Sequence, residues 1–162
     1  MTDRDARTRF FDPAEALERQ AAANPDDLGV LIDLIVHYSM MLDPGIAAAA
    51  KLSAAAMAQA QTRREHVFVL AAARFAAAPR LEFWRRYLRW AELGEPFPED
   101  DCRVLAAAEP TNPEPALYLF ACCRDPLAES AARELLRRVQ ATESERASYI
   151  RAVLGSAFSS SA

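Results

Sequence analysis

Few residues in this sequence could do chemistry, and the first candidates are a histidine and an aspartate. His37 follows Asp33 by four residues, so on a helix the carboxylate could orient the imidazole as a general base. Such a base needs a nucleophile, and no motif in the sequence offers one. We therefore expect the pair to be a polar stripe on a buried helix. A ligand-binding pocket or an enzyme site near His37 is the alternative.

The cysteines are the second candidates for chemistry. Cys102, Cys122 and Cys123 make an odd number, and two of them are adjacent. Adjacent helical positions point about 100° apart, so two such thiols cannot hold one metal ion without further ligands. We expect reduced thiols that pack as small hydrophobic side chains. The sequence also lacks a glycine-rich phosphate loop and His/Glu metal spacing, so we predict no catalytic residue, no metal and no cofactor.

The third candidate is an aromatic, arginine-rich stretch over residues 81–92. It places four aromatic residues within eight positions. On a helix the rings share one broad arc and the arginines lie opposite. Aromatic residues and arginine are enriched in protein interfaces, although a helix with core rings and solvated arginines has the same pattern. The predicted partner-binding residues are Phe83, Arg85, Arg86, Tyr87, Arg89 and Trp90.

Composition bounds the fold and the partners. The 162 residues include only four glycines and few β-branched residues, while alanine is abundant, so we predict an all-α protein. The net charge of −4 argues against nucleic acid or an anionic membrane surface as a partner. The longest apolar run, residues 28–36, is too short to cross a membrane. Because no signal peptide is visible, we expect a cytoplasmic protein.

Proline and glycine indicate where the helices begin and end. Five Asp-Pro or Asn-Pro pairs predict helix starts at Asp12, Asn24, Asp43, Asn112 and Asp125, because the side chain can cap and proline tolerates the first helical position. Glycines at 94 and 155 predict helix ends. We expect a flexible segment over 1–11, one helical domain over 12–155 and a disordered tail over 156–162. The expected helices cover 13–23, 26–41, 44–61, 63–77, 81–92, 99–108, 116–123, 126–140 and 143–154.

Three pairs of these helices resemble the helical hairpins of tetratricopeptide-repeat proteins. About nine antiparallel helices would then stack as hairpins, in a degenerate solenoid of this type or in a compact bundle. The residues that match the repeat pattern are Leu31, Leu34 and Tyr38 in the first pair; Phe68, Ala71, Ala72, Phe75, Leu88, Ala91 and Pro96 in the second; and Leu119 to Cys123 with Ala132, Leu136 and Val139 in the third.

The resemblance implies a protein-binding module whose concave surface takes a peptide or a partner helix, as in adaptors and chaperones. We therefore expect a non-enzymatic protein–protein interaction module with a groove next to the helix over 81–92. The partner is another protein or a peptide. A homodimer closed by apolar residues such as Tyr149 and Val153 is a further hypothesis.

Overall fold

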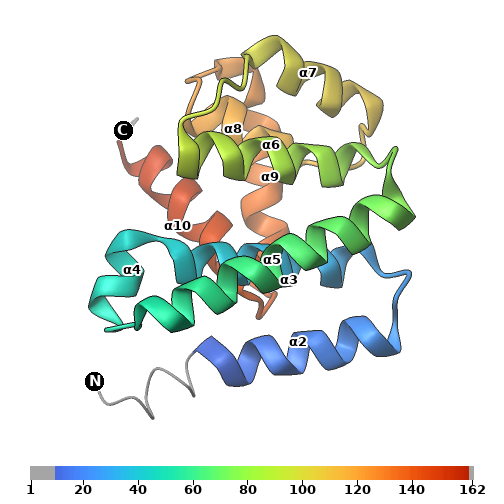
Figure 1. Cartoon of the computed structure of the whole chain (residues 1–162). Helices are drawn as coiled ribbons and strands as arrows, with labels where there is room; N and C mark the ends of the chain where they lie inside the picture. The colour runs from blue at the N-terminus through green and yellow to red at the C-terminus, as the bar shows by residue number, and fades with distance from the viewer. Residues whose placement is uncertain (1–9, 161–162) are drawn as a thin grey trace. The chain divides into compact units, whose positions relative to one another are not determined.

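The computed structural model describes residues 10–160, and this part of the chain is all-helical (Figure 1). It contains nine α-helices and one short 3-10 helix, and no strand among the residues described. The predicted all-α fold class is confirmed. The chain divides between Ala76 and Ala77 into two compact units, and the single domain expected over 12–155 stays a prediction.

The N-terminal unit is built around one helix that is apolar on nearly every side. This helix, α3, buries ten of its fifteen residues and packs against the other three helices of the unit. Because no side of it is polar enough to face water, neighbours must cover it. The four helices are α2 (Asp12–Ala23), α3 (Leu28–Leu42), α4 (Pro44–Ala49) and α5 (Ala54–Phe75).

The C-terminal unit is organised around α8, which is short and strongly apolar. All of its residues from Pro115 to Phe120 are buried, and it contacts α7, α9, α10 and the 3-10 helix η2. Helix α6 packs against α7. The elements of this unit are α6 (Pro79–Leu93), α7 (Glu99–Ala108), α8 (Pro115–Ala121), η2 (Pro126–Ala128), α9 (Glu129–Gln140) and α10 (Glu145–Ser159).

Two of the five predicted proline-linked starts are capped as expected. The carboxylate of Asp43 accepts a hydrogen bond from the Ile46 amide at 2.8 Å, and Asp125 accepts from the Leu127 amide at 2.9 Å. These bonds satisfy amides that have no partner within their helices.

None of the other three pairs caps its helix, although α2 begins at Asp12 as predicted. Asn24 ends α2, and Asp27 caps α3 instead. Asp12 lies inside α2, while Asn112 accepts from the Glu114 amide in the turn before α8. A proline restrains the preceding residue to an extended backbone in any chain reversal. At Asn24 and Asn112 the pair therefore marks a reversal rather than the start of a helix.

The alanine-rich helix expected over 44–61 is broken in two. Lys51 adopts a positive φ of 49°, and the Leu52 amide bonds to the Ala47 carbonyl at 2.9 Å. This pattern closes a helix in the way that a glycine usually does. Ser53 then caps α5. With lysine in place of glycine, the break carries no obvious sequence signal.

The C-terminal helix continues past the end predicted at Gly155. Helix α10 runs to Ser159, so the tail expected over 156–162 is helical as far as that residue. The reason is packing: the Phe158 ring lies 4.5 Å from the Phe120 ring between centroids. Residues 161–162 lie outside the described part of the chain.

The described end of the N-terminal segment is also ordered by packing. Phe10 is only 5% exposed, and its carbonyl accepts a hydrogen bond from His37 Nε2 at 2.6 Å. The segment expected to be flexible over 1–11 therefore includes a residue, Phe10, that packs into the N-terminal unit. Residues 1–9 lie outside the described residues.

Candidate functional site

Two of the predicted partner-binding residues belong to an aromatic core in the C-terminal unit. Phe83 is fully buried and Tyr87 is 2% exposed. Their rings contact two rings of the same helix and three from other parts of the chain, which helical periodicity could not bring to them. Neither side chain has a surface to offer a partner. The other rings of this core are Trp84, Trp90, Phe97, Tyr118 and Tyr149.

Trp90 is the half-buried edge of that core, with its ring 5.0 Å from the Tyr118 ring. Tyr149, which we considered for a homodimer, bonds through its hydroxyl to the Tyr87 hydroxyl at 2.8 Å. Burial raises the pKa of Tyr87 well above its usual value. The Tyr87 phenol therefore acts as a core hydrogen-bonding group and stays protonated at neutral pH.

The arginines predicted to bind a partner lie on the outer face of α6, and each forms an ion pair with a nearby carboxylate. These pairs are at least partly exposed, so each contributes little to stability. Their charges are already balanced locally. The pairs are Arg85 with Glu82 at 2.7 Å, Arg86 with Asp101 at 2.8 Å and Arg89 with Glu95 at 3.5 Å.

The histidine and aspartate do not form a general base and its orienter. His37 is 1% exposed, and its Nε2 atom donates to the Phe10 carbonyl. Its Nδ1 atom has no hydrogen-bond partner among the described residues, so Asp33 does not orient the ring. His37 instead ties α3 to the chain before α2.

The three cysteines are free thiols. Burial raises the pKa of Cys102 to about 12 and that of Cys122 to about 11, and it also raises the pKa of Cys123. Thiols of this kind are poor nucleophiles at neutral pH. No group of three or more His, Cys, Asp or Glu side chains within residues 10–160 is arranged to hold a metal ion.

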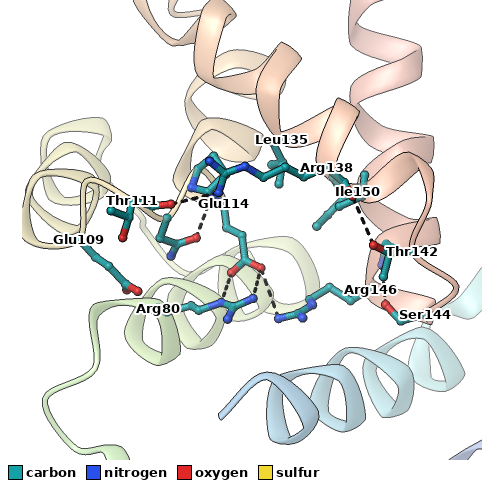
Figure 2. Close-up of a pocket in the computed structure, with 14 residues that line it drawn as sticks. Arg80, Glu109, Thr111, Glu114, Leu135, Arg138, Thr142, Ser144, Arg146 and Ile150 are labelled. Atoms are coloured by element: carbon teal, nitrogen blue, oxygen red, sulfur yellow. Dashed lines mark hydrogen bonds and ion pairs between the residues drawn. The ribbon is translucent and has the colours of Figure 1, made fainter. Parts of the chain in front are cut away.

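The candidate site is formed by residues that the sequence did not single out, and it centres on Glu114. Glu114 is 5% exposed. Arg80 donates to both carboxylate oxygens at 2.7 and 2.8 Å, and the Trp84 indole donates at 2.8 Å. Arg146 adds an ion pair at 3.3 Å. Figure 2 shows this carboxylate between the two guanidinium groups.

Local sequence explains why Glu114 points into the unit. The Asn112 side chain accepts a hydrogen bond from the Glu114 amide at 3.1 Å, an Asx turn that reverses the chain. Pro113 and Pro115 flank the glutamate, and the Glu114 carbonyl then accepts from Leu117 as α8 begins. The one sequence signal for this residue is a carboxylate between two prolines, directly before a buried helix.

Opposing effects set the charge of Glu114. Burial alone would raise the pKa of this carboxyl group, but the Arg80 hydrogen bonds, the charges of Arg146 and Arg80, and the Trp84 donor outweigh it. The pKa of Glu114 therefore lies below its usual value. A carboxylate held in the charged form by three donors is not available as a general acid at neutral pH.

Glu114 lies at the edge of a cleft of about 280 Å3 that we call the arginine cleft. The cleft is formed by the loop before α8, the end of α9 and the start of α10, together with Arg80 from α6 (Figure 2). Its polar members are mainly arginines and hydroxyl groups. The lining residues are Arg80, Glu109, Thr111, Asn112, Pro113, Glu114, Leu135, Arg138, Val139, Thr142, Ser144, Arg146, Ala147 and Ile150.

A second cleft of about 450 Å3, which we call the apolar groove, adjoins the first. The two share Thr111, Asn112, Pro113 and Arg138. At its edge Leu127 is 82% exposed. The remaining lining residues of the groove are Arg103, Ala106, Pro110, Pro115, Ala116, Leu119, Asp125, Leu127, Ala128, Ala131 and Glu134.

Comparisons of the chain with protein-family models, with curated proteins and with solved structures found no match. The resemblance to tetratricopeptide hairpins therefore stays a prediction. Among the residues described, no helix combines the length and hydropathy needed to cross a bilayer.

Proposed function

We propose that the C-terminal unit is a non-enzymatic binding module that docks an apolar side chain of a partner protein segment in the apolar groove. The observation that carries the proposal is Leu127, 82% exposed at the edge of a groove lined by small apolar and proline side chains. Burying a side chain of this size stabilises a complex by about 1.5–3 kcal/mol.

The charges of the groove favour an apolar occupant. Its lining carries two arginines, Arg103 and Arg138, and two carboxylates, Asp125 and Glu134. Arg103 pairs with Asp125 at 3.0 Å, and Arg138 pairs with Glu134 at 2.8 Å. The polar groups at the rim are thus balanced within the chain. An interface with an apolar centre and a paired polar rim has the anatomy that protein segments recognise.

This proposal keeps the interaction module suggested by residues 81–92 but moves the groove. Phe83 and Tyr87 are buried within the unit, and the arginines of the outer face of α6 have acidic partners. The surface of α6 is therefore a weaker candidate than the groove formed by α7, α8, η2 and α9. The biological role that we propose for such a module is that of an adaptor or a chaperone-like protein built from tetratricopeptide-like hairpins.

The test selects peptides from a library of random short peptides displayed on phage, with the full chain as the target. Leu127→Asp places a charge at the rim of the groove. We expect it to weaken binding of the selected peptides by about ten- to a hundredfold, the loss of one buried apolar contact. Leu127 is so exposed that the fold should survive, which circular dichroism checks. Affinity is measured by fluorescence anisotropy.

Leu93→Asp is the matched control, because Leu93 is 65% exposed and does not line the groove. Its affinity for the selected peptides should be unchanged. Equal binding by the two variants would contradict the proposal. A dimer that Leu127→Asp dissociates, seen by light scattering at two concentrations, would identify a second copy as the occupant in place of a different partner.

A further inference from the structure

The arginine cleft carries positive charge in a chain whose net charge is −4. Its lining includes three guanidinium groups, from Arg80, Arg138 and Arg146, and two carboxylates, from Glu109 and Glu114. Three of the five charged groups of the lining are therefore cationic, although Arg138 is also paired with Glu134, which lies outside the lining. A concave site with low-dielectric walls concentrates such a field and raises the local concentration of anions.

The Glu114 carboxylate of the cleft is not open to a cation. Both oxygens of Glu114 already accept hydrogen bonds from Arg80, and one also accepts from Trp84. A visiting ligand therefore meets the guanidinium side of these pairs. Glu114 acts as a positioning residue that holds Arg80 and Arg146 beside the cleft.

Arg138 is the most accessible of the three arginines. Its side chain is 52% exposed, yet it is held on two sides: Nε donates to Glu134 at 2.8 Å and Nη1 donates to the Thr111 carbonyl at 3.2 Å. A guanidinium group fixed in this way loses little side-chain entropy when it binds an anion.

Ser144 and the helix that it caps add further donors. The Ser144 hydroxyl oxygen accepts from the Ala147 amide at 3.1 Å, so its own hydrogen is available to a ligand in the cleft. The residue caps α10, a helix of fifteen residues. The positive end of the helix dipole therefore lies at the arginine cleft and reinforces the charge of Arg146.

We propose that the arginine cleft is a binding site for a small oxyanion, a carboxylate or phosphate group, with Arg138, Arg146 and Ser144 as its donors. Guanidinium groups match the geometry of both oxyanions. The volume of about 280 Å3 lies at or below the small end of ligand sites. It suits a small acid or one acidic side chain rather than a nucleotide.

The test titrates inorganic phosphate and succinate separately into the full chain, with sodium chloride holding the ionic strength constant so that general screening does not change. The readout is the ¹⁵N–¹H spectrum of the backbone amides and the arginine side chains. We expect saturable shifts at Ser144, Arg146 and Arg138. Shifts that rise without saturation, or that chloride alone reproduces, would overturn the proposal.

A pair of neighbouring arginines supplies a matched control. Arg137 and Arg138 both bond to Glu134, but only Arg138 lines the cleft. Arg138→Gln should weaken anion binding by about tenfold, the effect of losing one charge-assisted contact. Arg137→Gln should leave binding unchanged. Equal losses in the two variants would mean that the ion responds only to the general field of α9, and the proposal would fail.

The oxyanion has two sources, which a further arm separates. Because the arginine cleft and the apolar groove share Thr111, Asn112, Pro113 and Arg138, an acidic residue of a docked segment can reach the cleft. If it does, replacing Asp or Glu by Asn or Gln in a bound peptide lowers the affinity of that peptide, and phosphate competes with the peptide for the cleft. If these replacements do not change peptide binding while phosphate still binds saturably, the ligand of the cleft is a free small anion. The phosphate titration does not depend on Leu127, which lines only the groove, so its failure is distinguishable from a failure at Leu127.

Discussion

Each unit joins its helices through a glutamate that accepts hydrogen bonds from an aromatic residue and an arginine. In the N-terminal unit, Glu18 of α2 accepts from the Tyr38 hydroxyl of α3 at 2.6 Å and from Arg63 of α5 at 3.1 Å. In the C-terminal unit, Glu114 accepts from Trp84 and Arg80. The chemistry of the two groups is the same, and their surroundings are not.

The difference is burial and charge balance. The Glu18 side chain is 36% exposed and that of Arg63 is 33% exposed. This ion pair therefore has one anion and one cation, and both are accessible to water. The Glu114 side chain is 6% exposed and has two arginines, with Arg146 as the second. An exposed balanced pair contributes little to stability. A buried carboxylate with an excess of cations both holds the fold and leaves charge for a ligand.

Glu114→Gln should therefore have the largest effect on stability. The amide has the same shape as the carboxyl group but leaves Arg80 and Arg146 without an anion in a site largely removed from water. We expect a loss of roughly 3 kcal/mol, at the low end for breaking a buried ion pair because both arginines keep some contact with solvent. Urea unfolding followed by tryptophan fluorescence measures it, since Trp84 and Trp90 both belong to this unit. A loss below about 1 kcal/mol would contradict the role assigned to Glu114.

The pH dependence of the C-terminal unit should follow from the same group. The pKa of Glu114 is lowered in the folded chain, so its stabilising contribution is present above the usual glutamate pKa. It is lost as the pH falls through the lowered, folded-state pKa. Acid should destabilise the native unit more steeply than the Glu114→Gln variant, which has no proton to bind there. Fluorescence-monitored urea unfolding at several pH values tests this, and parallel slopes would contradict it.

The aromatic donors give a smaller and directly matched comparison. Trp84→Phe removes an indole N–H that donates to a buried carboxylate and also leaves a cavity, because Trp84 is fully buried. We therefore expect a loss of at least about 2 kcal/mol. Tyr38→Phe removes only a hydroxyl that donates to a half-exposed carboxylate, and we expect about 1 kcal/mol. Fluorescence of Trp90 reports the first variant and far-ultraviolet circular dichroism reports the second. Equal losses of stability in the two variants would show that burial does not make the hydrogen bond to Glu114 stronger than the one to Glu18.

Local features of the fold could be predicted from the sequence because they depend on neighbouring residues. Gly94 ends α6 with a φ of 67°, as expected for a glycine at that position. Helix α7 spans Glu99–Ala108, the predicted range. Periodicity placed Phe83 and Tyr87 on one face, but it could not tell a core from a surface. The rings that cover them come from other helices.

The candidate site could not be predicted because its partners are far apart in the chain. Arg80, Trp84 and Arg146 each lie thirty or more residues from Glu114. Helical periodicity reports which residues share a face, but which faces meet is decided by packing over the whole unit. The helix end at Lys51 could not be predicted for a different reason. Lysine seldom adopts a positive φ, so this residue gives no signal for the end of a helix.

Glu18→Gln should have the smallest effect and completes the comparison. The amide oxygen can still accept from Tyr38, and Arg63 can turn to water, because both charged side chains are about one third exposed. We expect a loss below about 1 kcal/mol that shrinks further as salt is added, since exposed pairs are screened. The loss from Glu114→Gln should change little with salt. Urea unfolding at low and high salt, followed by circular dichroism, measures both. If the two losses fall together with salt, Glu114 is electrostatically exposed and its distinction from Glu18 disappears.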